Sequence, residues 1–144
     1  MVFLGIALAA IGTVWTTTVR RDREAQLLFV GTAFRSAIGS YYASGPLAHQ
    51  LPHELDDLVQ DKRVPLPRRH LRRIYLDPMT GRADWRILRD PDGGIVGVSS
   101  SSQQAPIKRA NFAPEDAQFA SAKCYCEWKF EFSPLRRANA SRKK

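Results

Sequence analysis

Cysteine is scarce in this chain, and its scarcity limits the kinds of site that it can build. Only Cys124 and Cys126 occur, separated by Tyr125. A zinc site needs four ligands, so one pair of thiols is poor evidence for zinc. Residues two apart on a strand lie about 7 Å apart, and a bridge between them would be strained. We interpret both cysteines as ordinary strand residues, which leaves the redox compartment open.

Patterns typical of catalysis are also missing. Gly93, Gly94 and Gly97 have the wrong spacing for a phosphate loop, and no helix follows them. The serines at 99–102 have no base at a predictable distance. The 144 residues allow one domain of ordinary size, too small for a large enzyme with a deep cleft. We therefore expect a protein that is not an enzyme and that has no cofactor.

One histidine pattern keeps a metal site or a hydrolase as an alternative. His49, His53 and Asp57 follow one another at four-residue steps, so a helix could align them toward a metal. Pro52 interrupts that helix, and no further ligand is specified by spacing. Exposed residues at the start of a short helix explain the pattern equally well.

Charge is absent from the first part of the chain. Residues 1–19 contain no charged side chain, and a helix of this length spans roughly 30 Å, the thickness of a bilayer core. Trp15 precedes the basic group Arg20, Arg21 and Arg23, as expected at a membrane interface. A cleaved signal peptide normally begins with a basic residue, which is absent here. We predict a single-pass transmembrane anchor over 1–19, in preference to a cleaved signal or a buried soluble helix.

Small residues lie on one face of this segment. Gly5, Ala9 and Gly12 are spaced so that they share a helix face, where another helix can approach closely in lipid. Because glycine and alanine are common in any membrane helix, the match alone is weak.

The helix is expected to continue beyond the membrane because no proline occurs before Pro46. Apolar residues recur at three- and four-residue steps through the next segment, 20–43. The stripe includes Leu27, Val30, Phe34 and Ile38. The sequence Ser44-Gly45-Pro46 stops the helix. We predict an amphipathic continuation over 20–43 whose stripe packs on the downstream domain.

The remaining chain is expected to mix a short helix with strands. A helix over 51–60 is followed by an exposed connection at 61–73. Strands at 85–89 and 94–99 flank the turn Asp90-Pro91-Asp92-Gly93, a strong hairpin signal.

A loop over 100–122 leads to a last strand, 124–132. In that strand Cys124, Cys126, Trp128, Phe130 and Phe132 alternate onto one face. The fold class is α+β: a long N-terminal helix packed on a small antiparallel sheet, with the body at 44–133. The basic tail, 134–144, is expected to be disordered.

Two polar groups are candidates for ligand binding. The chain carries 22 Lys and Arg against 14 Asp and Glu, which favours acidic partners. Exposed arginines could bind phosphate of lipid or nucleic acid, but only Tyr75 is near them for base stacking, so a solvated or subunit-facing surface is preferred. These arginines are Arg68, Arg69, Arg72 and Arg73.

Asp77 and Asp84 form the second group. Their carboxylates could bind a hard cation such as calcium. In the alternative, Asp77 caps a turn and Asp84 is solvated.

Several segments together resemble a known family. The apolar segment runs into RRDREAQLLFVGTAFRSAIGSYY and is followed by PHELDDLVQD, LRRIYLDPMTGRADWRILRDPDGGIVGVSS and CYCEWKFEF. Over about residues 2–133 the chain resembles the type IV pilin-like pseudopilins of bacterial type II secretion, and more closely the minor pseudopilin-like proteins. The family's precursor has a basic leader, a processing-site Gly and an early Glu, so Met1 is expected to align inside the anchor with the leader missing.

The resemblance implies a structural role. In that family the helices bundle in a short periplasmic filament that pushes folded proteins through an outer-membrane channel. The partners would be other pseudopilin subunits and components of the secretion machine. Contacts between subunits would lie within residues 5–38, at Gly5, Ala9, Gly12, Leu27, Val30, Phe34 and Ile38.

The expected location is the bacterial inner membrane, with the body in the periplasm. The basic residues after the anchor favour the opposite orientation, but we follow the resemblance. The alternative function is a membrane-tethered module that binds nucleic acid during DNA uptake.

Overall fold

The structure is a computed structural model that describes the backbone of residues 2–46 and 49–134, and side chains from residue 15 onward within these ranges. Its elements are α1 (Val2–Ala43), α2 (Asp56–Val59), β1 (Arg86–Arg89), β2 (Ile95–Ser99), the 3-10 helices η1 (Pro114–Ser121) and η2 (Tyr125–Glu127), and β3 (Phe130–Glu131). The expected α+β class, with a long N-terminal helix and a small antiparallel sheet, is confirmed.

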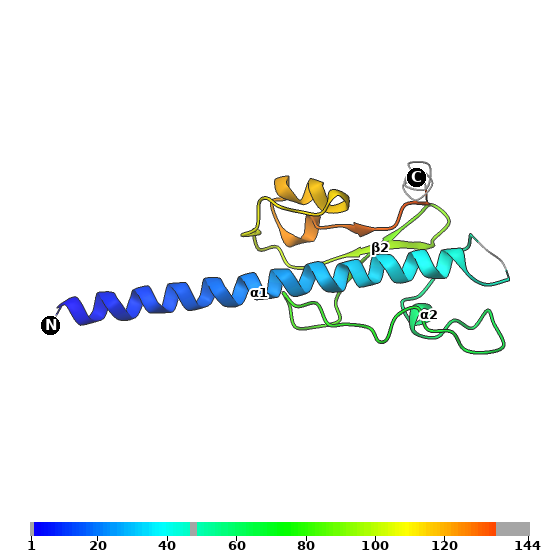
Figure 1. Ribbon diagram of the computed structural model, residues 1–144, viewed down its shortest axis with the longest axis horizontal. Coiled ribbons are helices and arrows are strands. Elements are labelled where there is room, and N and C mark those ends of the chain that lie inside the picture. The colour runs from blue at the N-terminus through cyan, green and yellow to red at the C-terminus, as the bar shows by residue number, and fades with distance from the viewer. Residues whose placement is uncertain (1, 47–48, 135–144) are drawn as a thin grey trace.

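The long helix α1 dominates the shape of the molecule. It runs unbroken for 42 residues, about 63 Å at 1.5 Å per residue. Its first half extends away from the body, while its second half lies along the sheet (Figure 1). The helix ends before Gly45, which has the positive φ of 91° that glycine adopts readily after a helix.

The sheet has the strand order β1-β2-β3, and both pairings are antiparallel. Val98 in the central strand lies opposite Ile87 on one side and Phe130 on the other. The predicted hairpin turn is present: Asp90 N–H donates to Gly94 C=O at 2.9 Å, and Gly94 N–H donates to the Asp90 carboxylate at 2.7 Å.

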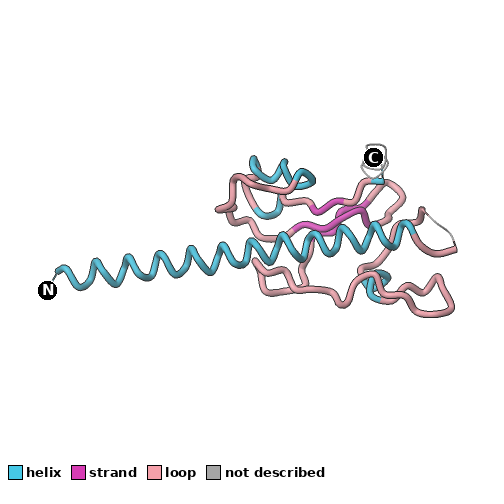
Figure 2. The backbone as a smooth tube through the Cα atoms, viewed as in Figure 1, coloured by secondary structure: helices cyan, strands magenta, loops and turns pink. Residues whose placement is uncertain are grey.

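The core lies between α1 and the sheet. Phe34 from the helix makes an edge contact with Trp85, with ring centroids 5.2 Å apart. Beside the sheet, Phe119 of η1 stacks on Trp128 at 5.3 Å. Figure 2 shows the strands along the second half of α1, with loops making up much of the rest of the body.

The predicted final strand is largely wrong. Only Phe130–Glu131 pairs with β2, and η2 replaces its first half. Tyr125 N–H donates to Gln104 C=O and Cys126 N–H to Ser102 C=O, so the chain bends toward the preceding loop. Tyr125, expected on the outer face, is therefore fully buried.

Two other boundaries also differ from those expected. The loop predicted over 100–122 contains η1. The helix predicted over 51–60 is confined to α2, because Pro52 C=O accepts a hydrogen bond from Ile95 N–H at 2.7 Å and ties the earlier residues to the sheet.

The predictions for the two ends of the chain fall largely outside the described residues. Among the residues whose side chains are described, no helix offers a stretch long and apolar enough to cross a membrane. Residues 1–14 of the predicted anchor have no described side chains, and the tail from 135 onward is not described.

Candidate functional site

The candidate site is the long helix itself, together with the contacts that hold it to the body. The stripe predicted on α1 is buried against the sheet, as expected for packing on the downstream domain. Leu27, Phe34 and Ile38 are 0% exposed and Val30 is 7% exposed. These four residues, also predicted as subunit contacts, are thus covered by their own chain. The other predicted contacts, Gly5, Ala9 and Gly12, lie outside the described side chains.

Gly31 sets how closely the helix approaches the sheet. A Cβ at this position would lie 2.3 Å from atoms of the Phe130 ring, so no larger residue fits without movement. At Gly39 a Cβ would meet the Phe132 ring at 3.0 Å. The sequence gives one signal for this contact: two glycines eight residues apart on the buried face of a long helix.

A buried carboxylate fastens α1 where the helix enters the body. Glu24 is 3% exposed. Its Oε1 accepts hydrogen bonds from Ile107 N–H at 2.6 Å, Lys108 N–H at 3.2 Å and Tyr125 O–H at 2.8 Å. Burial, and then the bond to Glu24, raise the pKa of the Tyr125 phenol. No local sequence pattern indicates this cluster, because Glu24 is more than eighty residues away from each of its partners.

A second polar contact lies halfway along the packed part of α1. Arg35 forms an ion pair with Asp116 of η1, with 2.5 Å between Nη2 and Oδ1. The guanidinium also lies 5.6 Å from the centre of the Phe130 ring. Both side chains are mostly buried, so this pair connects the helix to η1 in a setting with limited screening by water.

A third polar cluster holds the C-terminal end of α1. Asp61 accepts hydrogen bonds from Arg63 Nε at 3.0 Å and Arg63 Nη2 at 2.8 Å. Arg63 Nη2 also donates to Tyr41 C=O at 2.9 Å, and the guanidinium lies over the Tyr41 ring. His70 Nε2 lies 3.2 Å from Asp61 Oδ2, and His70 Nδ1 is 2.8 Å from Ser40 Oγ. Bonds from Arg63 hold the pKa of Asp61 well below its usual range, although burial acts in the opposite direction.

The contacts from Ser40 to His70 and from His70 to Asp61 resemble those of a hydrolase triad, but the residues around them favour a structural role. Arg63 bonds to both oxygens of Asp61 and already compensates its charge. Ser40 lies inside α1, where neighbouring N–H groups are used in helix hydrogen bonds. His70 lies between arginines in RRHLRR, a context typical of a solvated segment, yet its side chain is only 1% exposed.

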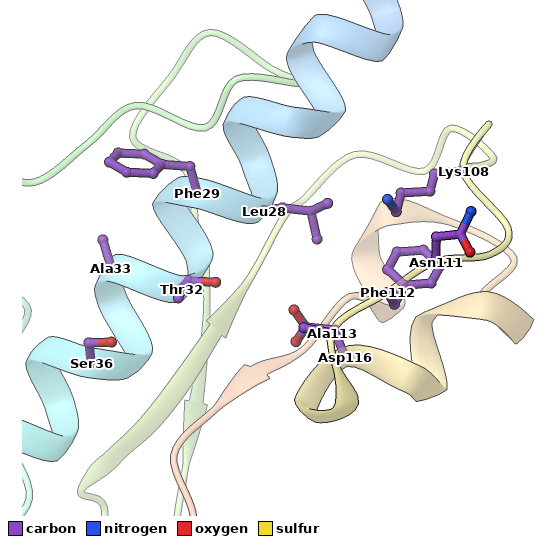
Figure 3. Close-up of a pocket in the computed structure, with 10 residues that line it drawn as sticks. All are labelled: Leu28, Phe29, Thr32, Ala33, Ser36, Lys108, Asn111, Phe112, Ala113 and Asp116. Carbon is purple, nitrogen blue, oxygen red and sulfur yellow. The ribbon is translucent and has the colours of Figure 1, made fainter.

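A groove runs between the exposed face of α1 and the segment before η1. Its volume is about 450 Å³. Figure 3 shows Leu28 pointing from α1 toward the segment with Lys108 and Phe112, whereas Phe29 points away from that segment. Phe29 is 68% exposed, an unusual exposure for a phenylalanine. The lining residues are Leu28, Phe29, Thr32, Ala33, Ser36, Lys108, Asn111, Phe112, Ala113 and Asp116.

The two predicted calcium ligands, Asp77 and Asp84, accept hydrogen bonds from nearby residues. Asp77 accepts hydrogen bonds from Met79 N–H at 2.9 Å and Ser100 O–H at 2.6 Å. Asp84 accepts one from Thr80 O–H at 2.6 Å. Within the described part of the chain, no three His, Cys, Asp or Glu side chains come together as a metal would require. The turn-capping alternative for Asp77 therefore describes its contacts.

The histidine pattern does not share a helix. His49 has a positive φ of 74° and its ring lies 5.1 Å from that of Tyr42. The Asp57 carboxylate accepts hydrogen bonds from the N–H groups of His53 and Glu54. Because α2 begins only at Asp56, the four-residue spacing does not align the three side chains.

The four arginines proposed to bind anions all lie exposed in the connection after Asp61. Arg73 is placed over the Tyr75 ring at 5.2 Å. Arg68 contributes its C=O to a bridge with Asp61 N–H. Arg69 and Arg72 are exposed on the same connection.

Cys124 and Cys126 form a disulfide, contrary to their interpretation as ordinary strand residues. Their Cα atoms are 5.1 Å apart, closer than on a strand, because η2 turns the chain between them. Tyr125 lies at the centre of this turn and reaches Glu24, so the disulfide supports the contact where α1 enters the body.

No protein family, curated protein or solved structure matches this chain. Its function is inferred from its architecture and its own side chains.

Proposed function

We propose that this chain is a pilin-like structural subunit of a bacterial type II secretion pseudopilus, and that it assists protein export by filament assembly. The observation that carries the proposal is α1, one continuous helix from Val2 to Ala43. Its first half extends beyond the body (Figure 1), residues 1–19 carry no charged side chain, and its second half forms one side of the core. A helix divided in this way can join a lipid-embedded bundle to a folded head.

The proposed mechanism is assembly, without bond chemistry. The apolar segment 1–19 anchors the subunit in the inner membrane. Gly5, Ala9 and Gly12 allow the helix of another pseudopilin to approach closely. The exposed face of α1, which includes Phe29, continues this contact beyond the membrane. As subunits are added, the filament lengthens and pushes the exported protein outward.

The disulfide supports a periplasmic body. Disulfides persist in oxidising compartments, including the periplasm, and are rare in the cytosol. Basic residues after the anchor favour the opposite orientation. One of these residues, Arg20, instead donates a hydrogen bond to Ala105 C=O. We give the disulfide more weight than the basic residues in choosing the orientation, because a body in the periplasm explains directly why the disulfide forms.

The proposal is tested by crosslinking in the bacterium that carries the gene. A photoreactive benzoylphenylalanine replaces Phe29, an exposed aromatic residue on α1. The expected product is a covalent adduct with another pseudopilin, formed when the secretion machine is expressed. The same probe at Asp92, on the hairpin turn, provides a matched exposed control and should give a smaller yield.

A second variant separates assembly from folding. Gly5→Leu with Ala9→Leu should keep the protein in the membrane fraction but reduce the Phe29 adduct and protein export at least several-fold. The proposal fails if a correctly folded, membrane-bound chain gives no adduct and its deletion leaves export unchanged.

The exposed arginines favour nucleic-acid binding as the second candidate function. This function predicts measurable affinity for duplex DNA at low salt and a steep loss as salt is added. Replacing Arg68, Arg69, Arg72 and Arg73 with Gln should then weaken binding. The pseudopilin proposal does not require DNA binding. Fluorescence anisotropy with labelled DNA makes the measurement, and the absence of affinity at low salt would remove this second candidate.

A further inference from the structure

The body begins directly where the uncharged segment ends. Val19 is the last residue of that segment, and Arg20 already donates a hydrogen bond to Ala105 C=O. One turn later, Glu24 binds the backbone of Ile107 and Lys108. No length of bare helix therefore separates the predicted anchor from the loop 104–108.

The surface at this junction combines an aromatic residue, aliphatic groups and positive charge. A hollow of about 320 Å³ lies between α1 and two loops of the body. It is lined by Trp15, Thr16, Val19, Arg20, Arg23, Met79 and Gln104. The indole of Trp15 is 73% exposed, and Arg21 and Arg23 are also exposed. Trp is enriched at the interface between lipid and water, and Arg can extend its charged group to that interface while its stem contacts apolar surface.

We propose that this end of the body seats in the headgroup layer of the bilayer and prefers anionic phospholipids. We call the surface the collar and define it as Trp15, Val19, Arg21, Arg23, Met79 and Gln104. The inference rests on the proposed membrane anchor and extends it to the folded body. If residues 1–19 cross the hydrocarbon core, Arg21 and Arg23 lie at the depth of the lipid phosphates, and Met79 and Gln104 lie beside them on the body.

Charge and continuity favour a bilayer as the occupant of this surface. Arg21 and Arg23 flank Asp22, so the exposed helix turn has a net positive charge. Basic residues close to an anionic leaflet are attracted to its lipid headgroups. The collar is also continuous with the apolar segment, so the same bilayer that holds the helix would cover it.

The test uses the full chain reconstituted into vesicles. An environment-sensitive fluorescent amino acid replaces Gln104 in the collar or, as a matched control, Gln60. Both glutamines are exposed. Gln60 is next to Asp61, whose polar cluster lies at the C-terminal end of α1, far from the collar. We expect a blue shift and quenching by brominated lipid at position 104, with neither at position 60.

Selectivity is measured by comparing phosphatidylcholine vesicles with vesicles that contain about one-third phosphatidylglycerol. The emission shift at position 104 should be larger with the anionic lipid, and the difference should disappear in about 1 M salt, where the screening length is about 3 Å. Arg21→Gln with Arg23→Gln should remove the difference, whereas Arg69→Gln with Arg72→Gln should preserve it.

The outcomes separate this inference from the proposed function. A chain that floats with vesicles but keeps position 104 in water retains its anchor and overturns the collar. Equal shifts in neutral and anionic vesicles also overturn the proposed preference for anionic lipid. A chain that does not associate with vesicles overturns the anchor and the collar together.

Discussion

Asp61 illustrates how one buried charge is maintained in this protein. Its side chain is inaccessible to solvent, and an isolated carboxylate in such a place would be strongly destabilising. Arg63 compensates the charge through two side-chain hydrogen bonds, and His70 lies beside it. The ionised carboxylate therefore belongs to the folded state, and its depressed pKa links stability to pH.

Asp61→Asn should destabilise the protein by about 3 kcal/mol at neutral pH, because it leaves the Arg63 charge without its partner. The folded pKa is lowered, so the stabilisation is complete above the unfolded pKa of about 3.9 and is lost as pH falls through the folded pKa. The difference between variant and wild type should consequently shrink below about pH 4. Urea unfolding across this range measures both effects.

Asp92→Asn serves as the control, because Asp92 is exposed on the hairpin turn. Its unfolding curve should follow that of the wild type at each pH. A difference for Asp61→Asn that stays constant from neutral pH to about pH 2.5 would contradict the assigned role of its charge.

The polar clusters could not be predicted from neighbouring residues. His70 stands between arginines in RRHLRR, a context typical of a solvated segment. Its partners, Ser40 and Asp61, are thirty and nine residues away. Glu24 likewise meets Tyr125 from the other end of the chain. Such contacts depend on tertiary packing, which single-sequence periodicity does not specify.

At the scale of elements, the contact between α1 and β3 depends on a glycine. In an open helix, Gly→Ala is stabilising by about 1 kcal/mol. Gly31→Ala should instead destabilise by about 1–3 kcal/mol, because the new methyl group overlaps the Phe130 ring. Gly39→Ala should cost less, since the Phe132 ring is farther away. Urea unfolding of the two variants measures which one loses more unfolding free energy.

Thr32→Ala is the control for helix propensity, because Thr32 lies on the exposed face of the same helix. It should leave stability unchanged or raise it slightly. A Gly31→Ala variant more stable than the wild type would show that the helix can shift away from Phe130 without loss.

Elements that are specified by neighbouring residues could be predicted from the sequence. Elements that depend on hydrogen bonds to residues far along the chain could not. The absence of proline and the apolar spacing predicted α1, and Asp90-Pro91-Asp92-Gly93 predicted the hairpin. The alternation over 124–132 predicted a strand, but hydrogen bonds to Ser102 and Gln104 bend this segment into η2. Alternation indicates which side chains can be buried and does not reveal which backbone groups they will meet.

At the scale of the whole molecule, the disulfide gives a test of orientation. When cells are quenched with acid and the protein is denatured before labelling, Cys124 and Cys126 should resist a polyethylene-glycol maleimide until a reductant is added, because the two sulfurs are bonded to each other. Electrophoresis should then show a shift for two added groups. Cys124→Ser is the control, since it leaves Cys126 as a thiol that reacts without reductant.

Reaction of both native thiols in the absence of reductant would place the body in a reducing compartment. Such a result would contradict the periplasmic orientation while leaving the fold unchanged. The readout is independent of the crosslinking experiment, so orientation and assembly are measured separately.

The unbroken course of α1 also has a mechanical consequence. A helix without a hinge transmits an axial load from one end to the other through its backbone hydrogen bonds. Polar contacts at three positions along α1, Glu24, Arg35 and Tyr41, transfer that load to the body. A force or torque applied to the first half of α1 is therefore transmitted to the body through these three contacts.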